Sequence, residues 1–126
     1  MIQGAGMLGL TAAAMVRSRG ARVVLVCDVN ASRLARAVDF GATHTLLAHS
    51  PPEDAAREIQ SMTEGRGVDL AIELSGAPAA IELGLRGLRI GGRYVLIGST
   101  RPEPPVQLDA EAVVRRCLSI VGNHNY

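Results

Sequence analysis

Short apolar runs alternate with amphipathic stretches along the whole chain. Each run is almost continuously apolar, which is typical of parallel strands that helices cover on both faces. The runs lie at residues 22–28, 44–47, 68–73, 93–97 and 117–121. Met1 to Gln3 are expected to be the truncated remainder of a further, first strand, so the pattern predicts a sheet of about six strands.

The stretches between the runs carry apolar residues at helical spacing. Leu8, Ala12 and Met15 form such a stripe in a helix expected from Met7 to Arg19. Further helices are expected after Asn30, after the capping box Ser50-Pro51-Pro52-Glu53, from Pro78 to Leu88 and after Asp109. Because strands and helices alternate, the strands must pair in parallel through right-handed crossovers. We therefore expect an α/β fold, a doubly wound parallel sheet forming a single domain over residues 1–126.

A glycine-rich run, Gly4-Ala5-Gly6-Met7-Leu8-Gly9, stands between the first strand and the first helix. In a Rossmann fold the first glycine of such a run allows a tight turn, and the second lets a pyrophosphate approach the backbone. The third lets the helix pack closely on its strand. The N–H groups at the start of the helix then face the phosphate. The run alone is a weak signal, and it gains weight from a following helix and from an acidic residue about 20 positions later.

Asp28 is that acidic residue, at the end of the run at residues 22–28. Its carboxylate is suited to accept hydrogen bonds from the adenosine ribose and to repel a 2′-phosphate, which favours NAD over NADP. The alternative is that Asp28 only begins a turn with Val29 and Asn30. Arg33 follows five residues later and either lies over the ribose or adenine, or is a solvated helix residue.

Composition and charge exclude several other classes of function. The chain has 126 residues, of which 48% are hydrophobic and 20% charged, and its net charge is +1. Nothing therefore indicates a nucleic-acid partner or an anionic membrane surface. No apolar run reaches about 18 residues, and no signal peptide is visible, so we expect a cytoplasmic protein. Cys27 and Cys117 are isolated, which argues against a disulfide framework or a cysteine-rich zinc site.

No catalytic or metal-binding set of residues emerges from the remaining polar positions. His44, His49 and His124 lack partners at metal-ligand spacing. No serine lies in a G-x-S-x-G elbow. Glu73 is expected at a strand end near the crevice, and Asp69 at the start of the same strand. We therefore predict no catalytic residue and no metal ligand in this chain.

Taken together, the motifs resemble the cofactor domain of the zinc-type medium-chain alcohol dehydrogenases. The matching set, in order, is Gly4 to Gly9, Asp28 with Arg33, Phe40-Gly41-Ala42-Thr43, Gly65 to Asp69, Glu73-Leu74-Ser75-Gly76 and Gly91 to Gly98. The closing Val121 to Tyr126 is similar to a subgroup associated with phosphonate catabolism. The resemblance covers essentially the whole chain and is far more specific than the glycine run alone.

The resemblance implies a role for each matching residue. Gly4, Gly6, Met7, Leu8 and Gly9 would hold the pyrophosphate, and Asp28, Val29 and Arg33 the adenosine. Ser75 and Gly76 would border the adenine side of the crevice, and Ile97, Gly98, Ser99, Asn123 and Asn125 would offer backbone groups to the nicotinamide carboxamide. The segment from Val106 to Leu108 would be an edge strand that pairs with its copy in a homodimer.

The chain also departs from the family pattern. The family's zinc is held in a separate GroES-like domain, which this sequence lacks, so zinc is expected only outside it. The chain would then be a fragment of an NAD-dependent alcohol or polyol dehydrogenase, inactive alone and marginally stable because its first strand is short. Three alternatives stay open: a zinc-free quinone or enoyl reductase, which usually prefers NADPH, a non-catalytic nucleotide-binding regulatory module, and, more weakly, an S-adenosylmethionine methyltransferase. The substrate cannot be read from this sequence.

Overall fold

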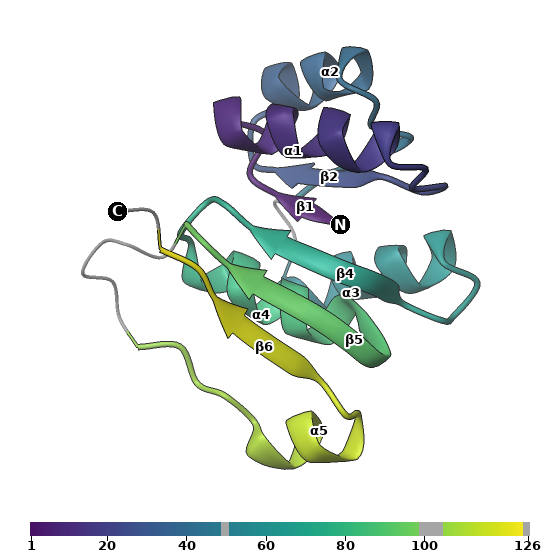
Figure 1. Cartoon of the computed structure of the whole chain (residues 1–126). Coiled ribbons are helices and arrows are strands. Elements are labelled where there is room, and N and C mark those ends of the chain that lie inside the picture. The colour runs from purple at the N-terminus through teal and green to yellow at the C-terminus, as the bar shows by residue number, and fades with distance from the viewer. Residues whose placement is uncertain (49–50, 99–104, 125–126) are drawn as a thin grey trace.

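A computed structural model describes residues 1–48, 51–98 and 105–124 (Figure 1). In chain order the elements are β1 (Ile2–Gln3), α1 (Met7–Ser18), β2 (Leu25–Asp28), α2 (Ala31–Asp39), β3 (His44–Leu47), α3 (Pro52–Met62), β4 (Val68–Glu73), α4 (Pro78–Gly87), β5 (Leu88–Leu96), α5 (Ala110–Arg115) and β6 (Ser119–Gly122). The strands form one six-stranded sheet in the order β3-β2-β1-β4-β5-β6, and every pair is parallel. The expected doubly wound α/β fold is confirmed.

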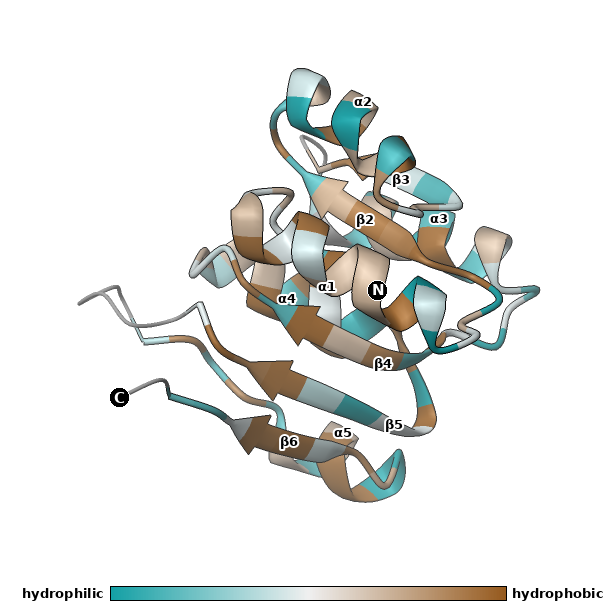
Figure 2. Cartoon of the chain, turned by 45° about the horizontal axis from the view of Figure 1, so that its top comes forward, coloured by the Kyte–Doolittle hydropathy of each residue, from teal (hydrophilic) through white to brown (hydrophobic). Residues whose placement is uncertain are grey.

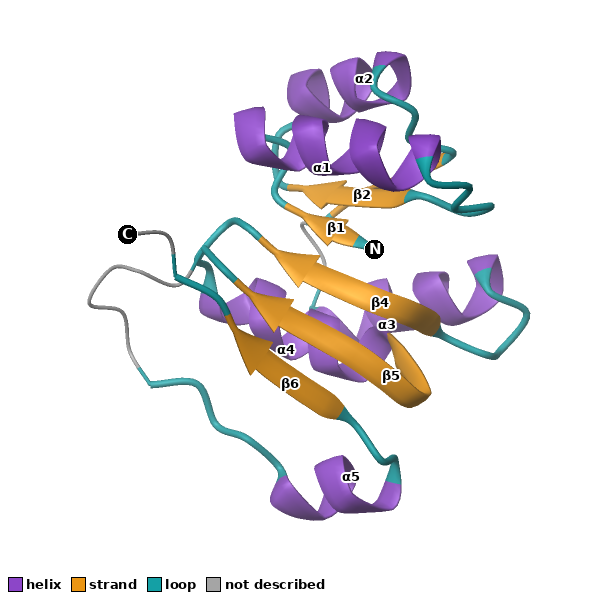
Figure 3. Ribbon diagram, in the orientation of Figure 1, coloured by secondary structure: helices purple, strands orange, loops and turns teal. Residues whose placement is uncertain are grey.

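The order of the strands reverses between β1 and β4. From β1 the chain builds outward through β2 to β3, then returns to β4 on the other side of β1 and continues to β5 and β6 (Figure 3). In open parallel sheets this reversal opens a crevice at the carboxyl ends of the strands, where ligands bind. The residues directly after β1, β4 and β5 therefore lie at the expected ligand site.

Two hydrophobic layers cover the sheet, one on each face. On one face α1 and α2 pack Leu10, Ala13, Leu34 and Ala37 against Ile2, Val24 and Val26. On the other face α3 and α4 pack Ala55, Ile59, Ile81 and Leu83 against Leu25, Cys27, Ala71 and Tyr94. Successive residues of a strand point to opposite faces, so a strand covered on both sides must be apolar at every position. Figure 2 shows hydrophobic colour over most of β2 and β4, whose charged residues are Asp28, Asp69 and Glu73.

The first strand is as short as expected, yet it lies at the centre of the sheet. Ile2 pairs with Val26 on one side and Ile72 on the other, and Gln3 pairs with Cys27 and Glu73. Ile2 and Gln3 are both buried. Met1 extends the pairing with β4, because its carbonyl accepts the N–H of Ile72 at 3.0 Å.

Several predicted boundaries are wrong by a few residues. β2 begins at Leu25 rather than residue 22, and α1 ends at Ser18 rather than Arg19. β6 begins at Ser119, because Cys117 turns the chain with a φ of +50°. β5 begins at Leu88 and runs through the two glycines that were expected only to lead into it. This longer strand follows from its pairing with β4, where the register shifts between Val68 and Leu70.

The predicted helix caps are partly confirmed. The side chain of Asn30 accepts the N–H of Arg33 at 3.1 Å, and that of Asp109 accepts the N–H of Ala112 at 3.0 Å. The capping box before α3 is wrong, because Pro51 is the N-cap and has no side-chain hydrogen bond. Pro52 therefore takes the first helical position, and Ser50 lies outside the described residues.

The segment from Val106 to Leu108 is a loop rather than a strand of this chain. It leads into α5 and is exposed along its length. None of the described strands pairs with it, and its expected pairing with a second copy stays a prediction.

Candidate functional site

The glycine loop between β1 and α1 forms a tight turn under the start of the helix. Gly4 has a φ of +100°, which favours glycine, and its N–H donates to the carbonyl of Cys27 at 2.8 Å. A Cβ on Gly9 would collide with the carbonyl oxygen of Gly4 and would lie 2.9 Å from its carbonyl carbon. A Cβ on Gly6, by contrast, would meet nothing within 4 Å. The loop is therefore closed on the sheet side and open at Gly6.

The start of α1 is suited to bind an anion. Its N-cap is Gly6, which provides no side-chain hydrogen bond, and no acidic residue lies in the first turn. The side chains of Met7 and Leu8 are turned outward, with exposed fractions of 81% and 60%. The first N–H groups of a helix have no partner within it and carry its positive dipole end. A cofactor pyrophosphate fits this position, because it would supply the missing acceptors.

Asp28 lies beside this loop, at the carboxyl end of β2. Its Oδ2 accepts the N–H of Ala5 at 2.6 Å, and its Oδ1 accepts the N–H of Asn30 at 2.8 Å. Both sequence interpretations of Asp28 therefore have a structural basis: it does begin the turn into α2, and it stands next to the phosphate loop. A carboxylate oxygen has capacity for more than one hydrogen bond, so both ribose hydroxyls can still be accepted.

The other two residues expected around the adenosine flank Asp28. The Nη1 atom of Arg33 lies 4.0 Å from Oδ2 of Asp28, and the Arg33 side chain is 60% exposed. Val29 follows Asp28 directly and is exposed. These positions are compatible with an adenosine lying across the end of β2.

The residues after β4 lie on the opposite side of β1 from Asp28. Ser75 still approaches the glycine loop, since a Cβ on Gly4 would lie 3.1 Å from the Ser75 backbone nitrogen. Ser75 and Gly76 therefore border the crevice at its centre, and their place on the adenine side stays a prediction.

The residues expected around the carboxamide lie after β5 and β6. The N–H groups of Ile97 and Gly98 donate to the carbonyl of Glu73 at 3.0 Å, and that of Asn123 donates to Leu96 at 2.9 Å. The backbone groups that these three residues can offer a carboxamide are thus their carbonyl oxygens. Ser99 and Asn125 lie outside the described residues.

Glu73 is the residue of the crevice whose importance the sequence did not reveal. It ends β4, and its side chain is 0% exposed. Its Oε1 accepts three hydrogen bonds, from the Ser75 N–H at 2.7 Å, the Ser75 hydroxyl at 2.6 Å and the Gly76 N–H at 2.8 Å. Its Oε2 is buried without a partner among the residues that the structure describes. An acidic residue at a strand end followed by Ser-Gly was the available signal for this arrangement.

The described part of the chain contains no group of three or more His, Cys, Asp or Glu side chains that could hold a metal ion. Asp69 lies at the start of β4, as expected, where a hydrogen bond from Arg89 lowers the pKa of its carboxyl. Cys27 is a buried free thiol, and burial raises its pKa to about 12, so it is not a reactive group at neutral pH. Among the described residues, no helix is long and apolar enough to cross a membrane.

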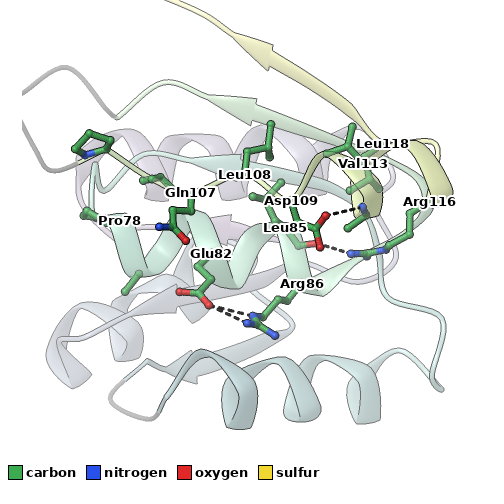
Figure 4. Close-up of a pocket in the computed structure, with 14 residues that line it drawn as sticks. Pro78, Glu82, Leu85, Arg86, Gln107, Leu108, Asp109, Val113, Arg116 and Leu118 are labelled. Atoms are coloured by element: carbon green, nitrogen blue, oxygen red, sulfur yellow. Dashed lines mark hydrogen bonds and ion pairs between the residues drawn. The ribbon is translucent and has the colours of Figure 1, made fainter.

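A surface groove of about 840 Å³ lies between α4 and residues 105–118 (Figure 4). Its charged side chains are engaged within the chain: Arg86 donates to Glu82 at 2.9 Å, and Arg116 donates to the Leu85 carbonyl at 2.9 Å. Asp109 caps α5. Because these groups already have partners, the crevice at the strand ends is the better candidate site.

Comparison with known proteins identifies the family of the chain. A sequence profile of the family described as zinc-binding dehydrogenase matches residues 8–126. The L-threonine 3-dehydrogenase of Bacillus velezensis is 40% identical over 122 residues, which make up 96% of this chain and 34% of that protein.

Solved structures of dehydrogenases are also similar to this chain. An alcohol dehydrogenase from Thermotoga maritima has a TM-score of 0.89 and 36% identity, over 96% of this chain and 34% of that one. A zinc-binding dehydrogenase from Sinorhizobium meliloti, solved with NADP bound, has a TM-score of 0.82 and 25% identity, over 96% of this chain and 35% of that one. The chain thus spans about a third of the length of these relatives.

Proposed function

The chain belongs to the zinc-binding dehydrogenase family, and we propose that it serves as the NAD(H)-binding domain of an alcohol or polyol dehydrogenase. The observation that carries this proposal is the pairing of an uncapped α1, open at Gly6, with the carboxylate of Asp28 bonded to the same loop. Few other ligands combine a phosphate that needs helix N–H groups with a ribose that needs an acidic residue.

Three groups of residues along the crevice bind three different parts of the cofactor. The first turn of α1 binds the pyrophosphate through its N–H groups. Asp28, Val29 and Arg33 hold the adenosine across the end of β2. The resemblance put Ser75 and Gly76 on the adenine side; we instead assign the residues directly after β4 and β5 to the nicotinamide half, because they lie on the opposite side of β1 from Asp28. The bound nicotinamide supplies the chemistry, by accepting or giving a hydride, and the chain orients it.

The preference for NAD over NADP rests on the charge of Asp28. A carboxylate beside the ribose accepts its hydroxyls and repels a 2′-phosphate. A hydrogen bond to a charged group contributes about 1.5–3 kcal/mol, so NADH should bind at least about tenfold more tightly than NADPH. One solved relative has NADP bound, so a direct test of the preference on this chain is needed.

Calorimetric titration of the chain with NADH and NADPH provides that test. Asp28→Ser should reduce or invert the preference. Asp39→Ser is the matched control, because it removes the same charge from an exposed position at the end of α2 and should leave the preference unchanged. Tighter binding of NADPH by the unchanged chain would contradict the proposal and favour a quinone or enoyl reductase.

Zinc and the alcohol substrate belong, in this proposal, to other parts of a protein as long as the relatives. In the reaction, zinc acts as a Lewis acid toward the alcohol oxygen. The residues described here contribute the cofactor half of the site, and their two free cysteines suit the reducing environment of the cytoplasm.

A homodimer formed through residues 106–108 is part of the proposal. Val106 and Leu108 are exposed apolar residues in an extended approach to α5, and a second copy would cover them. Sedimentation at tens of micromolar should show a dimer, and Leu108→Glu should dissociate it. Val38→Glu, an equally apolar and exposed position on α2, should leave the dimer intact. A monomer from the unchanged chain would contradict this part of the proposal.

A further inference from the structure

Glu73 occupies the point of the sheet where the strand order reverses. It pairs with Gln3 of β1 on one side and with Leu96 of β5 on the other, and it is completely buried. Burying a carboxylate is unfavourable unless hydrogen bonds compensate for its lost hydration. We propose that Glu73 is a positioning residue that sets the nicotinamide half of the cofactor site, an inference that rests on the proposed function.

The first part of this role is to fix the loop after β4. Three donors from Ser75 and Gly76 converge on the single oxygen Oε1. Hydrogen bonds to an ionised acceptor are shorter and stronger than those to a neutral one. Gly76 has a φ of +75°, so the loop turns sharply at the residue that the carboxylate holds. The carboxylate therefore determines where this loop meets the crevice.

The second part is to fix the loop after β5. The Glu73 carbonyl accepts the N–H groups of both Ile97 and Gly98 at 3.0 Å. A Cβ on Gly98 would lie 2.8 Å from Glu73 Oε2, 2.6 Å from the Gly76 nitrogen and 2.5 Å from the Leu74 carbonyl carbon. The two loops thus touch each other at Gly98, directly against the carboxylate. One residue holds both loops that face the nicotinamide half.

The adenosine half is held by a separate set of contacts. Asp28 bonds to Ala5 and Asn30, and the glycine loop bonds to Cys27; none of these contacts involves Glu73. A change at Glu73 should therefore weaken the binding of the nicotinamide half without weakening that of the adenosine half. A purely structural residue at the centre of the sheet would affect both halves together.

The test compares NADH with AMP, which carries only the adenosine half with one phosphate. Glu73→Gln keeps the shape of the side chain but offers a neutral acceptor, and we expect the Kd for NADH to rise about tenfold. The Kd for AMP should stay within twofold. The fluorescence of bound NADH, which reports the surroundings of the nicotinamide, should shift toward that of free NADH.

A second variant addresses the same contact without altering the carboxylate. Gly98→Ala forces a methyl group against Glu73 Oε2 and should produce the same selective loss of NADH affinity. Gly122→Ala is the matched control, because its Cβ would meet nothing within 4 Å and both affinities should be unchanged. Thermal melting followed by circular dichroism establishes that each variant is folded.

The outcomes separate this inference from the proposed function. If the unchanged chain binds neither NADH nor AMP, the proposed function fails and this inference fails with it. If the unchanged chain binds both, but Glu73→Gln and Gly98→Ala lose NADH and AMP affinity in equal proportion, or lose neither, only the role of Glu73 is overturned.

Discussion

At the scale of single residues, Gly6 and Gly9 illustrate how one loop uses the same amino acid for opposite reasons. A methyl group on Gly9 has no room, because the Gly4 carbonyl already occupies that space. A methyl group on Gly6 has open space and an ordinary φ of −74°. Packing within the protein thus requires glycine at position 9, whereas only a ligand that comes close to the backbone would require glycine at position 6.

Alanine substitutions should separate these two requirements. Gly9→Ala should lower the free energy of unfolding by about 1–3 kcal/mol or more, because the first turn of α1 must move away from the loop. Gly6→Ala should change the free energy of unfolding by less than about 0.5 kcal/mol. The Kd for NADH should nevertheless rise at least about tenfold, because a loss of about 1.4 kcal/mol in binding free energy at the pyrophosphate already corresponds to a factor of ten. Urea unfolding and calorimetric titration measure the two quantities. Unchanged NADH binding by Gly6→Ala would contradict the placing of the pyrophosphate beside Gly6.

Cys27 should make the protein sensitive to alkaline pH. Burial raises its pKa from the ordinary value of 9 to about 12, so the folded state holds the proton more tightly than the unfolded state. The resulting stabilisation is complete below pH 9 and is lost as the pH rises from 9 to 12. Between pH 9 and pH 10, above the range in which the Met1 amino group titrates in the folded protein, the loss should be about 1 kcal/mol.

Urea unfolding at pH 9 and pH 10 measures this loss, and variants assign it. Cys27→Ala should abolish most of it, and Cys117→Ala, at an exposed position, should not. The buried hydroxyl of Tyr94, whose pKa burial also raises, adds a further loss only above about pH 10. An identical loss in the Cys27→Ala variant would assign the alkaline sensitivity elsewhere.

The sequence predicted where the candidate site residues lie in the fold better than it predicted their contacts. The glycine spacing and the strand-end position of Asp28 were sufficient to locate the loop. The hydrogen bond between Asp28 and Ala5 could not be predicted, because a residue's position on a strand does not give the direction of its carboxylate oxygens. Glu73 was expected near the crevice for the same positional reason, and its three donors remained hidden until the loop after β4 was seen.

At the scale of elements, a buried polar contact joins α4 to the centre of the sheet. The Tyr94 hydroxyl donates to Oε1 of Gln3 at 2.7 Å, and the Gln3 amide donates to the Ala80 carbonyl in the first turn of α4. Gly84 of the same helix makes room for this contact. A Cβ on Gly84 would overlap the Tyr94 hydroxyl and would lie 2.7 Å from Gln3 Oε1.

Gly84→Ala should therefore destabilise the protein, although alanine favours a helix over glycine by about 1 kcal/mol. We expect a loss of about 1–3 kcal/mol in the free energy of unfolding. Tyr94→Phe in the same chain should recover part of the loss, because it removes the hydroxyl oxygen with which the new methyl group at position 84 collides. Gly87→Ala provides the comparison, because its Cβ would meet the tip of the Ile59 side chain at 3.1 Å, which can move. Simple additivity of the Gly84 and Tyr94 changes would argue against the contact.

The apolar pattern predicted some elements to the residue and others only in outline. The strands at 44–47 and 68–73 have the expected bounds. β5 is longer than its apolar run, because Leu88 already pairs with Val68 of β4, and Gly91 and Gly92 lie in the irregular stretch before the next pair, Leu70 with Arg93. Val106 to Leu108 has the composition of a strand but no partner strand among the described residues. Pairing, which a local pattern does not encode, decides where a strand begins and whether it forms.

At the scale of the whole molecule, the described residues form a cofactor site but not a reaction chamber. We expect residues 1–126 alone to bind NAD and to produce no NADH from a panel of alcohols, even with zinc added, because in the proposed function other parts of a protein as long as the relatives align the substrate against the nicotinamide. NAD at millimolar concentration should raise the Tm through mass action. Turnover above background that disappears on mutation within residues 1–126 would show that the chain holds its own catalytic groups.

The central place of β1 also determines the order in which the sheet can close as the chain is made. Ile2 and Gln3 find β2 soon after they leave the ribosome, but their other neighbours are Ile72 and Glu73. Contacts so distant in sequence form slowly, because a long loop must close before they do. Until then β1, the innermost strand of the finished sheet, is an open edge that invites pairing with another chain. Refolding yield should therefore fall as protein concentration rises, and slow synthesis would prolong the exposure of the very residues that end up most deeply buried.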